Sequence, residues 1–155
     1  MFSFKSSLYI IVIITITFFA CKKEDVKDDI TRENYYGSYL GEDTNSWGGW
    51  SLKHISITEA PFGEEFVFIN RLVRNFDHQI TATVDKDHIS FKDQKFHVDN
   101  HSPGGAHTVY DAQYFGSGTL DTNSGKLIIH YTEKQVFEDT TYIIQWICTT
   151  VKDSI

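Results

Sequence analysis

The stretch "TYIIQWICTTV", residues Thr141–Val151, alternates along its length as a β-strand with one buried face does. Successive residues of a strand point to opposite faces of the sheet, so one face of this strand would pack against the core. The other face still carries Ile143 and Ile147, which indicates that another element or a partner protein covers part of the outer surface. The residues of the predicted core face are Tyr142, Ile144, Trp146 and Cys148.

Runs of the same kind recur along the chain after Asn34, with turn residues between them. The turn signals include "DKD" at Asp85–Asp87, "NHSPGG" at Asn100–Gly105 and "DTNSG" at Asp121–Gly125, whose residues accept tight backbone angles. Short links favour antiparallel neighbours, so the sequence predicts an all-β, up-and-down meander of eight or nine strands that forms a barrel or half-open barrel. The expected strands are residues 35–41, 52–58, 65–72, 79–84, 88–91, 95–98, 109–120, 126–132 and 141–151.

The N-terminal end of the chain has the pattern of an export signal. A positively charged start precedes the uncharged run Leu8–Ala20, and a strongly charged segment follows that run. A membrane-spanning helix needs about 20 apolar residues, and this run ends before that length. An uncleaved membrane anchor is the alternative to an export signal. We therefore expect a signal peptide over residues 1–20, a charged flexible tether over residues 21–33 and a single barrel domain over residues 34–155.

The residues around Cys21 resemble the lipobox of bacterial lipoproteins, in which a small residue precedes the cysteine that receives a diacylglyceryl group. Ala20 and Cys21 match this pattern, whereas Phe18 and Phe19 stand where a leucine and a small residue are usual. The resemblance implies that fatty acyl chains such as palmitate are attached at Cys21, and each buried CH₂ of such a chain contributes about 0.8 kcal/mol to membrane binding. It also implies an outer-membrane lipoprotein of the cell envelope whose domain is periplasmic or exposed at the cell surface.

The formal net charge of −7 argues against nucleic acid and anionic lipid headgroups as partners, because both require a basic patch. The use of cysteine agrees with an anchored protein. If Cys21 is acylated, Cys148 has no disulfide partner, and no neighbouring histidine or basic residue in the sequence activates its thiol. We therefore expect Cys148 to be a small apolar residue of the core.

Five short motifs follow one another along the chain: "GSYLG" at Gly37–Gly41, "VFINRL" at Val67–Leu72, "ITATVDKDHISFKDQKF" at Ile80–Phe96, "GSGTL" at Gly116–Leu120 and "LIIHYT" at Leu127–Thr132. In this order they resemble the motifs of small lipocalin-like bacterial lipoproteins, and the resemblance covers most of the chain after the signal peptide. It implies a compact lipocalin-like antiparallel barrel behind a lipidated tail. It supplies no catalytic residues.

The segment "NSWGGW" places Trp47 and Trp50 between the first two expected strands, where a loop covers one end of a barrel. Indole rings there can stack on sugars or line an apolar pocket, and binding sites commonly lie in loops on a rigid scaffold. Tyr110 and Tyr114 belong to a nearby expected strand. The sequence therefore predicts a site for a small apolar or sugar ligand at this end of the barrel.

The densest polar segment of the chain, residues 97–111, carries three histidines and two aspartates. Imidazole and carboxylate groups bind zinc or copper, but the spacing matches no closed zinc pattern. Solvated loop histidines are therefore the main interpretation, and metal binding by His97, His101 and His107 is the alternative. No cofactor is expected.

No catalytic motif is present, so we expect a non-enzymatic domain. Paired carboxylates on separate strands can still meet in space, which keeps a cryptic hydrolase as an alternative. Another alternative is a structural or interaction lipoprotein whose filled barrel docks on an envelope protein through Ile143 and Ile147. A cavity beside Trp47 and Trp50 would favour ligand binding, a filled barrel would favour docking, and convergent buried carboxylates would favour a hydrolase.

Overall fold

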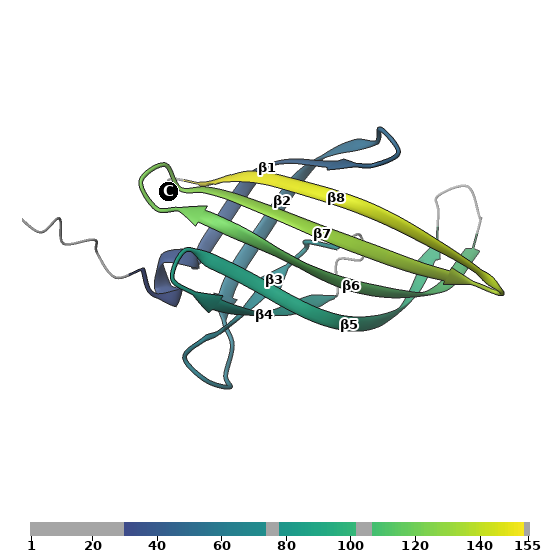
Figure 1. Cartoon of the computed structure of the whole chain (residues 1–155), viewed down its shortest axis with the longest axis horizontal. Helices are drawn as coiled ribbons and strands as arrows, with labels where there is room; N and C mark the ends of the chain where they lie inside the picture. Colours follow the sequence, from purple (N-terminus) through teal and green to yellow (C-terminus); the bar gives the residue numbers. More distant parts are fainter. Residues whose placement is uncertain (1–29, 74–77, 102–106, 154–155) are drawn as a thin grey trace, which may run out of the picture.

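Eight antiparallel strands close into a barrel in the computed structural model, which describes residues 30–73, 78–101 and 107–153. Each strand pairs with the next one along the chain and β8 pairs with β1, so the topology is up-and-down (Figure 1). This confirms the predicted all-β meander, with eight strands and a closed barrel, and it is consistent with a lipocalin-like fold. The strands are β1 (Gly37–Asn45), β2 (Trp50–Glu59), β3 (Phe66–Asn70), β4 (Gln79–Asp85), β5 (His88–His101), β6 (His107–Asp121), β7 (Lys126–Phe137) and β8 (Thr140–Lys152).

Two segments that the sequence predicts as separate strands, residues 88–91 and 95–98, belong to the single strand β5. The register of β5 against β6 shifts between Phe91 and Gln94, which is a bulge that absorbs extra residues without ending the strand. The side chain of Gln94 then bonds both backbone groups of Thr81 in β4, at 2.8 Å and 2.7 Å. The strand count is therefore eight, and an amide side chain continues the link between β4 and β5 beyond their last backbone pair.

The end of the barrel where β1 begins is closed by a short 3₁₀ turn, η1 (Arg32–Tyr35). Tyr35 is fully buried, and its hydroxyl donates to a backbone carbonyl of the β4–β5 turn at 3.0 Å. The hydroxyl of Tyr39 in turn donates to the carbonyl of Tyr35 at 2.7 Å. Arg32 lies 2.8 Å from the carboxylate of Glu59 at the end of β2. These contacts fix the turn on the barrel, so this end is sealed.

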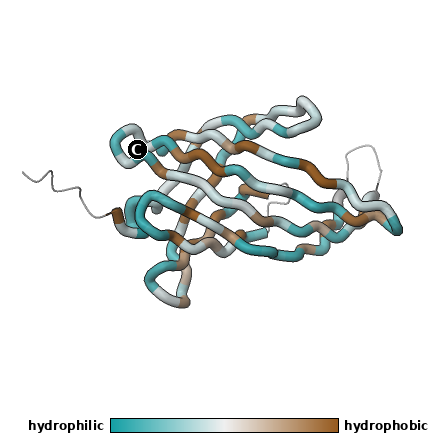
Figure 2. Tube along the Cα trace, in the orientation of Figure 1, coloured by the Kyte–Doolittle hydropathy of each residue, from teal (hydrophilic) through white to brown (hydrophobic). Residues whose placement is uncertain are grey.

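The alternation of β8 agrees with the sequence except at its first predicted core residue. Ile144, Trp146 and Cys148 are buried, whereas Tyr142 lies near the tip of the β7–β8 hairpin and is exposed. Cys148 is fully buried, which confirms the predicted core residue, and this burial raises the pKa of its thiol to about 12. The outer row remains exposed, with 59% of Ile143 accessible. Figure 2 shows apolar segments at intervals along β8.

Strands β6 and β7 approach each other closely at Gly116, which faces the barrel interior. A Cβ atom at this position would collide with the backbone carbonyl oxygen of His130 and with Tyr131. The glycine therefore allows β6 to bend across the barrel, as glycines at barrel corners commonly do. Because of this close approach, Tyr131 can extend into the interior without competition from a side chain on β6.

Candidate functional site

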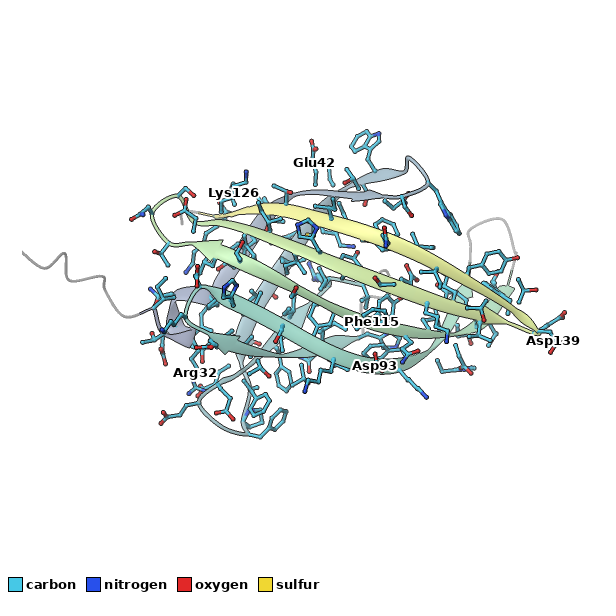
Figure 3. All side chains as sticks on the ribbon, in the orientation of Figure 1. Arg32, Glu42, Asp93, Phe115, Lys126 and Asp139 are labelled. Carbon is cyan, nitrogen blue, oxygen red and sulfur yellow. The ribbon has the colours of Figure 1, made fainter. Side chains whose placement is uncertain are left out.

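The barrel interior changes from apolar to partly polar toward the end of the barrel opposite η1. The half near η1 is filled by apolar side chains, whereas Asp43, Glu133 and Gln135 are buried toward the other end. This second end carries the β1–β2 turn, the end of β3 and the β7–β8 hairpin, and Asp139 marks the tip of that hairpin in Figure 3. Buried polar groups need partners, so the contacts of these residues determine what this end can do.

Glu133 on β7 lies at the centre of the first buried cluster and is 1% exposed. Its Oε1 accepts hydrogen bonds from the hydroxyl of Tyr114 at 2.9 Å and from the amide of Gln135 at 2.7 Å. Its Oε2 accepts a hydrogen bond from the indole N–H of Trp146 at 3.0 Å. Three donors on β6, β7 and β8 therefore surround this carboxylate and hold these three strands together at the interior.

Asp43 on β1 belongs to a second buried cluster. Its Oδ2 accepts a hydrogen bond from the hydroxyl of Tyr131 at 2.8 Å and lies 3.2 Å from the Nζ of Lys53. The side chain of Lys53 is 12% exposed, so the ion pair is largely withdrawn from water. Burial, together with the nearby Asp43 carboxylate, raises the pKa of Tyr131 well above its usual range and keeps the phenol protonated as a donor.

A recess of about 480 Å³ opens beside the second cluster. Strand β2 pairs with β1 from Trp50 to Ile57 but with β3 only from Ser56 to Glu59, so residues 50–55 have no strand partner on the β3 side within the described chain. The recess lies on this side. Its lining includes Asp43, Asn45, Trp50, Lys53, Arg71 and Trp146.

The wall formed by Trp50 depends on a tight turn between β1 and β2. The Oδ1 of Asn45 accepts hydrogen bonds from the backbone N–H groups of Trp47 and Gly49, both at 2.9 Å. Gly48 has a φ of 80°, which a glycine adopts without steric cost. The sequence "NSWGGW" therefore specifies the turn locally, and β2 begins with Trp50 at its rim.

The opposite wall depends on the bend that follows β3. Arg71 has a φ of 64°, a left-handed conformation that is uncommon for a residue with a side chain. This conformation directs the chain inward, where Leu72 is fully buried and its carbonyl accepts a hydrogen bond from Tyr131 at 3.4 Å. Arg71 itself is exposed and lines the recess.

The described lining of the recess is positively charged, although the whole chain has a formal charge of −7. Lys53 and Arg71 carry two positive charges, and Asp43 carries the one negative charge among the described lining residues. The Asp43 carboxylate is already paired with Lys53. Arg71 forms no ion pair with any residue that the structure describes, so its charge is the surplus.

The four residues that the sequence nominates for ligand contact do not gather at one place. Trp50 is 69% exposed and lines the recess, whereas Trp47 packs edge-on against Tyr142 at 6.4 Å between ring centroids. Tyr110 and Tyr114 are buried inside the barrel, where Tyr110 stacks on Phe137 and Tyr114 bonds Glu133.

Asp43, Lys53, Glu133 and Arg71 were not predicted as site residues from the sequence. A signal for Glu133 does exist, because it falls on the same alternation as Leu127 and Ile129, which are core residues of β7. A carboxylate in an apolar row indicates a buried, partnered acid. No local pattern marks the other three residues, whose roles depend on contacts between separate strands and the bend after β3.

The histidines proposed as alternative metal ligands lie on the β5–β6 hairpin. The Nδ1 of His97 lies 3.0 Å from Asp111 Oδ1, and both side chains are exposed. His101 and His107 are opposite each other in the strand register, but their side chains lie outside the described part of the structure. Among the described side chains, no group of three histidine, cysteine or acidic residues is placed to hold a metal ion.

The two buried carboxylates do not form a shared site. Asp43 lines the recess, whereas Glu133 is absent from its lining and is enclosed by its three donors. Acid–base hydrolysis by a carboxylate pair requires both groups to flank the same bond of the substrate. This arrangement therefore gives the hydrolase alternative no geometric support at the recess.

Comparison with protein-family models, with curated proteins and with solved structures found no match to the chain. Within the described residues, no helix has the length and apolar character that a membrane span requires. The predicted signal peptide (residues 1–20) and Cys21 lie outside the described residues.

Proposed function

We propose that this protein is a lipid-anchored lipoprotein of the cell envelope whose barrel binds a small sugar-like ligand, without catalysis, in the recess between β2 and the bend after β3. The observation that carries the proposal is the composition of the recess. The recess has a volume of about 480 Å³, and the residues that line it include Trp50, which is 69% exposed, and the charged pair of Asp43 and Lys53. This volume lies within the range that is typical of small-molecule sites.

A sugar suits this recess better than a purely apolar ligand. An aromatic face stacks on the C–H face of a sugar ring, while charged groups bond its hydroxyls. An apolar ligand would bury the Asp43–Lys53 pair without new hydrogen bonds, which is costly. The barrel interior near η1 is filled by its own side chains, including Tyr39, Ile57 and Leu127, so it offers little support for a ligand held there.

The ligand proposal is tested by titrating the full-length chain, kept in detergent, with neutral and acidic monosaccharides and following tryptophan fluorescence. Saturable binding that weakens in Trp50→Ala is the expected result. Binding that is unchanged in this variant would place the ligand elsewhere. The absence of binding by every sugar in the series would refute the proposal.

The anchor is supported by the resemblance of the residues around Cys21 to a lipobox and by the charged segment that follows. With Cys21 acylated, the protein would be held at the outer membrane, on its periplasmic side or at the cell surface. Mass spectrometry of protein extracted from membranes would test this directly. A mature N-terminus at Cys21 with added acyl mass is expected, and an unmodified chain beginning at Met1 would contradict it.

A second candidate function is docking on another envelope protein through the outer face of β8. Ile143 and Ile147 are exposed on that face, and Leu40 of β1 lies opposite the exposed Val151 in the strand register. A shallow hollow of about 430 Å³ on the neighbouring outer surface is lined in part by Ile147 and Phe115, which is labelled in Figure 3. Loss of a cross-linked partner in envelopes that carry Ile143→Ser and Ile147→Ser would support docking.

A further inference from the structure

The connection between β2 and β3 carries a phenylalanine cluster, formed by Phe62, Phe66 and Phe68, on the outside of the barrel. Phe66 and Phe68 belong to the outer row of β3, because Val67 and Ile69, which alternate with them, are buried. Phe62 packs edge-on against both rings, with 6.0 Å and 5.5 Å between ring centroids. Phe62 is still 50% exposed, and Figure 1 shows the connection projecting from the barrel. The cluster therefore presents an apolar tip that the barrel leaves partly in water.

The surrounding structure holds this tip in one conformation. Gly63 has a φ of 97°, which favours glycine, and a Cβ atom there would lie 3.1 Å from the ring of Phe66. The carbonyl of Gly63 accepts hydrogen bonds from the backbone N–H of Phe66 at 3.4 Å and from Nη1 of Arg32 at 3.0 Å. These bonds fix the tip against η1, so the exposure of Phe62 is a property of the folded protein.

The tip lies next to the point where the described chain begins. Arg32, two residues after Ile30, bonds the tip at Gly63, and its Nη2 lies 2.8 Å from the carboxylate of Glu59. From Cys21 to Ile30 a fully extended chain spans at most about 32 Å. An anchor at Cys21 would therefore keep the phenylalanine cluster within this reach of the bilayer surface.

The charges beside the cluster indicate which lipid surface it fits. Glu59, Glu64 and Glu65 are exposed, and the cation that contacts this connection, Arg32, is already paired with Glu59. Anionic headgroups attract basic segments and would be repelled here. A zwitterionic headgroup carries an ammonium group, which attracts these carboxylates. The cluster therefore suits a zwitterionic surface.

We propose that the phenylalanine cluster rests in the headgroup region of a zwitterionic bilayer, as a second membrane contact of the tethered barrel. This inference rests on the proposed lipid anchor and adds a contact that the anchor does not provide. Exposed apolar groups mark interaction sites, and a projecting tip enters a fluid bilayer without a matching surface on a partner. One such tip binds weakly, but the tether raises its effective concentration at the membrane, so a weak contact is maintained.

The test maps which residues touch lipid in the full-length chain. Protein extracted from membranes is reconstituted into phosphatidylcholine vesicles that contain a small share of phosphatidylcholine with a photoreactive diazirine near the top of one acyl chain. After illumination, mass spectrometry of the peptides should show lipid attached within residues 61–68. Replacing part of the phosphatidylcholine by phosphatidylglycerol should lower this labelling, and an increase would contradict the assigned lipid class.

The decisive variant is Phe62→Ser, which removes the exposed ring. It should reduce the labelling of residues 61–68 about fivefold, because half of a phenylalanine is still available for burial in lipid. Phe115→Ser is the matched control, since Phe115 is 39% exposed on β6, which is not a neighbour of β3, and it should leave this labelling unchanged. Thermal melting checks that both variants fold, and Phe62→Gln replaces Phe62→Ser if the latter does not.

The outcomes separate the lipid contact from the anchor. Labelling of residues before Ile30 without labelling of residues 61–68 would overturn the inference and leave the anchor intact. Labelling of the outer face of β8 in place of the tip, or equal labelling in Phe62→Ser and the parent protein, would overturn it as well. An unmodified chain that begins at Met1 would refute the anchor. In that chain, labelling of the tip would still support the lipid contact, and its absence would overturn it.

Discussion

The hydroxyl of Tyr131 on β7 donates to the carboxylate of Asp43 on β1 across the barrel interior, at 2.8 Å. These two strands are not neighbours in the sheet, because β8 lies between them. The hydrogen bond therefore links the two strands on either side of β8, and the same carboxylate forms an ion pair with Lys53 on β2. One buried acid thus connects three strands on the side of the barrel where the recess opens.

Loss of the cation beside Asp43 should destabilise the fold. In Lys53→Met the largely buried carboxylate keeps its charge but loses its ion-pair partner, so we expect the free energy of unfolding to fall by about 3 kcal/mol. Urea denaturation followed by tryptophan fluorescence measures this. The double variant Asp43→Asn with Lys53→Met should recover part of the loss, and an equal or larger loss would contradict the ion-pair explanation.

Replacement of the other buried acid by its amide should be unfavourable as well. In Glu133→Gln one of the positions that now accept bonds from Tyr114, Gln135 and Trp146 becomes an N–H donor that faces another donor. We expect a loss of about 2 kcal/mol in the free energy of unfolding. The matched control is Glu138→Gln, which makes the same change at an exposed position and should leave the free energy of unfolding nearly unchanged. Urea denaturation of both variants measures the difference.

The two rim tryptophans should differ in ligand binding. Trp50 lines the recess, and Trp50→Ala should weaken sugar binding about tenfold. Trp47 packs against Tyr142 instead, so Trp47→Ala serves as the matched control and should bind as the parent protein does. Titrations that show the same loss in both variants would place the ligand over the whole turn.

The close approach of β6 and β7 at Gly116 gives a steric prediction. Gly116→Ala places a Cβ against the carbonyl oxygen of His130, so we expect a loss of about 3 kcal/mol in stability. Gly48→Ala has open space around its Cβ and pays only for its φ of 80°, about 1 kcal/mol. Thermal melting of both variants measures the difference, and a larger loss in Gly48→Ala would contradict the close approach of β6 and β7.

The protein should lose stability in alkali. Burial raises the pKa of the Cys148 thiol from 9.0 to about 12 and that of Tyr39 to about 12, so the unfolded chain releases these protons first. The contribution of these two groups to the free energy of unfolding is therefore fully present below about pH 9. It falls as the pH rises toward 12, by up to about 1.4 kcal/mol per pH unit for each group. Urea midpoints between pH 8 and 11 measure this slope, which should be smaller in Cys148→Ala.

The sequence was sufficient for the fold class because its signals are local. The alternation of Thr141–Val151 and the turn residues at Asp121–Gly125 each act within one strand or hairpin, and the structure confirms both apart from Tyr142, which is exposed. The bulge at Lys92–Asp93 was missed because an interruption of alternation is indistinguishable from a strand end in sequence alone. Its recognition requires the register of the partner strand.

The candidate site was predictable only in part, because its parts come from segments far apart in the chain. Trp50 was found because an exposed aromatic residue beside glycines is a local signal. The ion pair of Asp43 with Lys53 requires the pairing of β1 with β2, and the position of Arg71 requires the early end of β3. Neither can be inferred from spacing along the sequence.

The seal formed by η1 has a consequence for orientation at a membrane. Figure 1 shows η1 at the end of the barrel away from the β1–β2 turn, and Arg32 lies near that end in Figure 3. About ten residues separate Cys21 from η1, and even fully extended they reach at most about 36 Å. A barrel tethered there would stand with its sealed end toward the lipid and its recess open to passing solutes, so capture would not require the ligand to enter the bilayer.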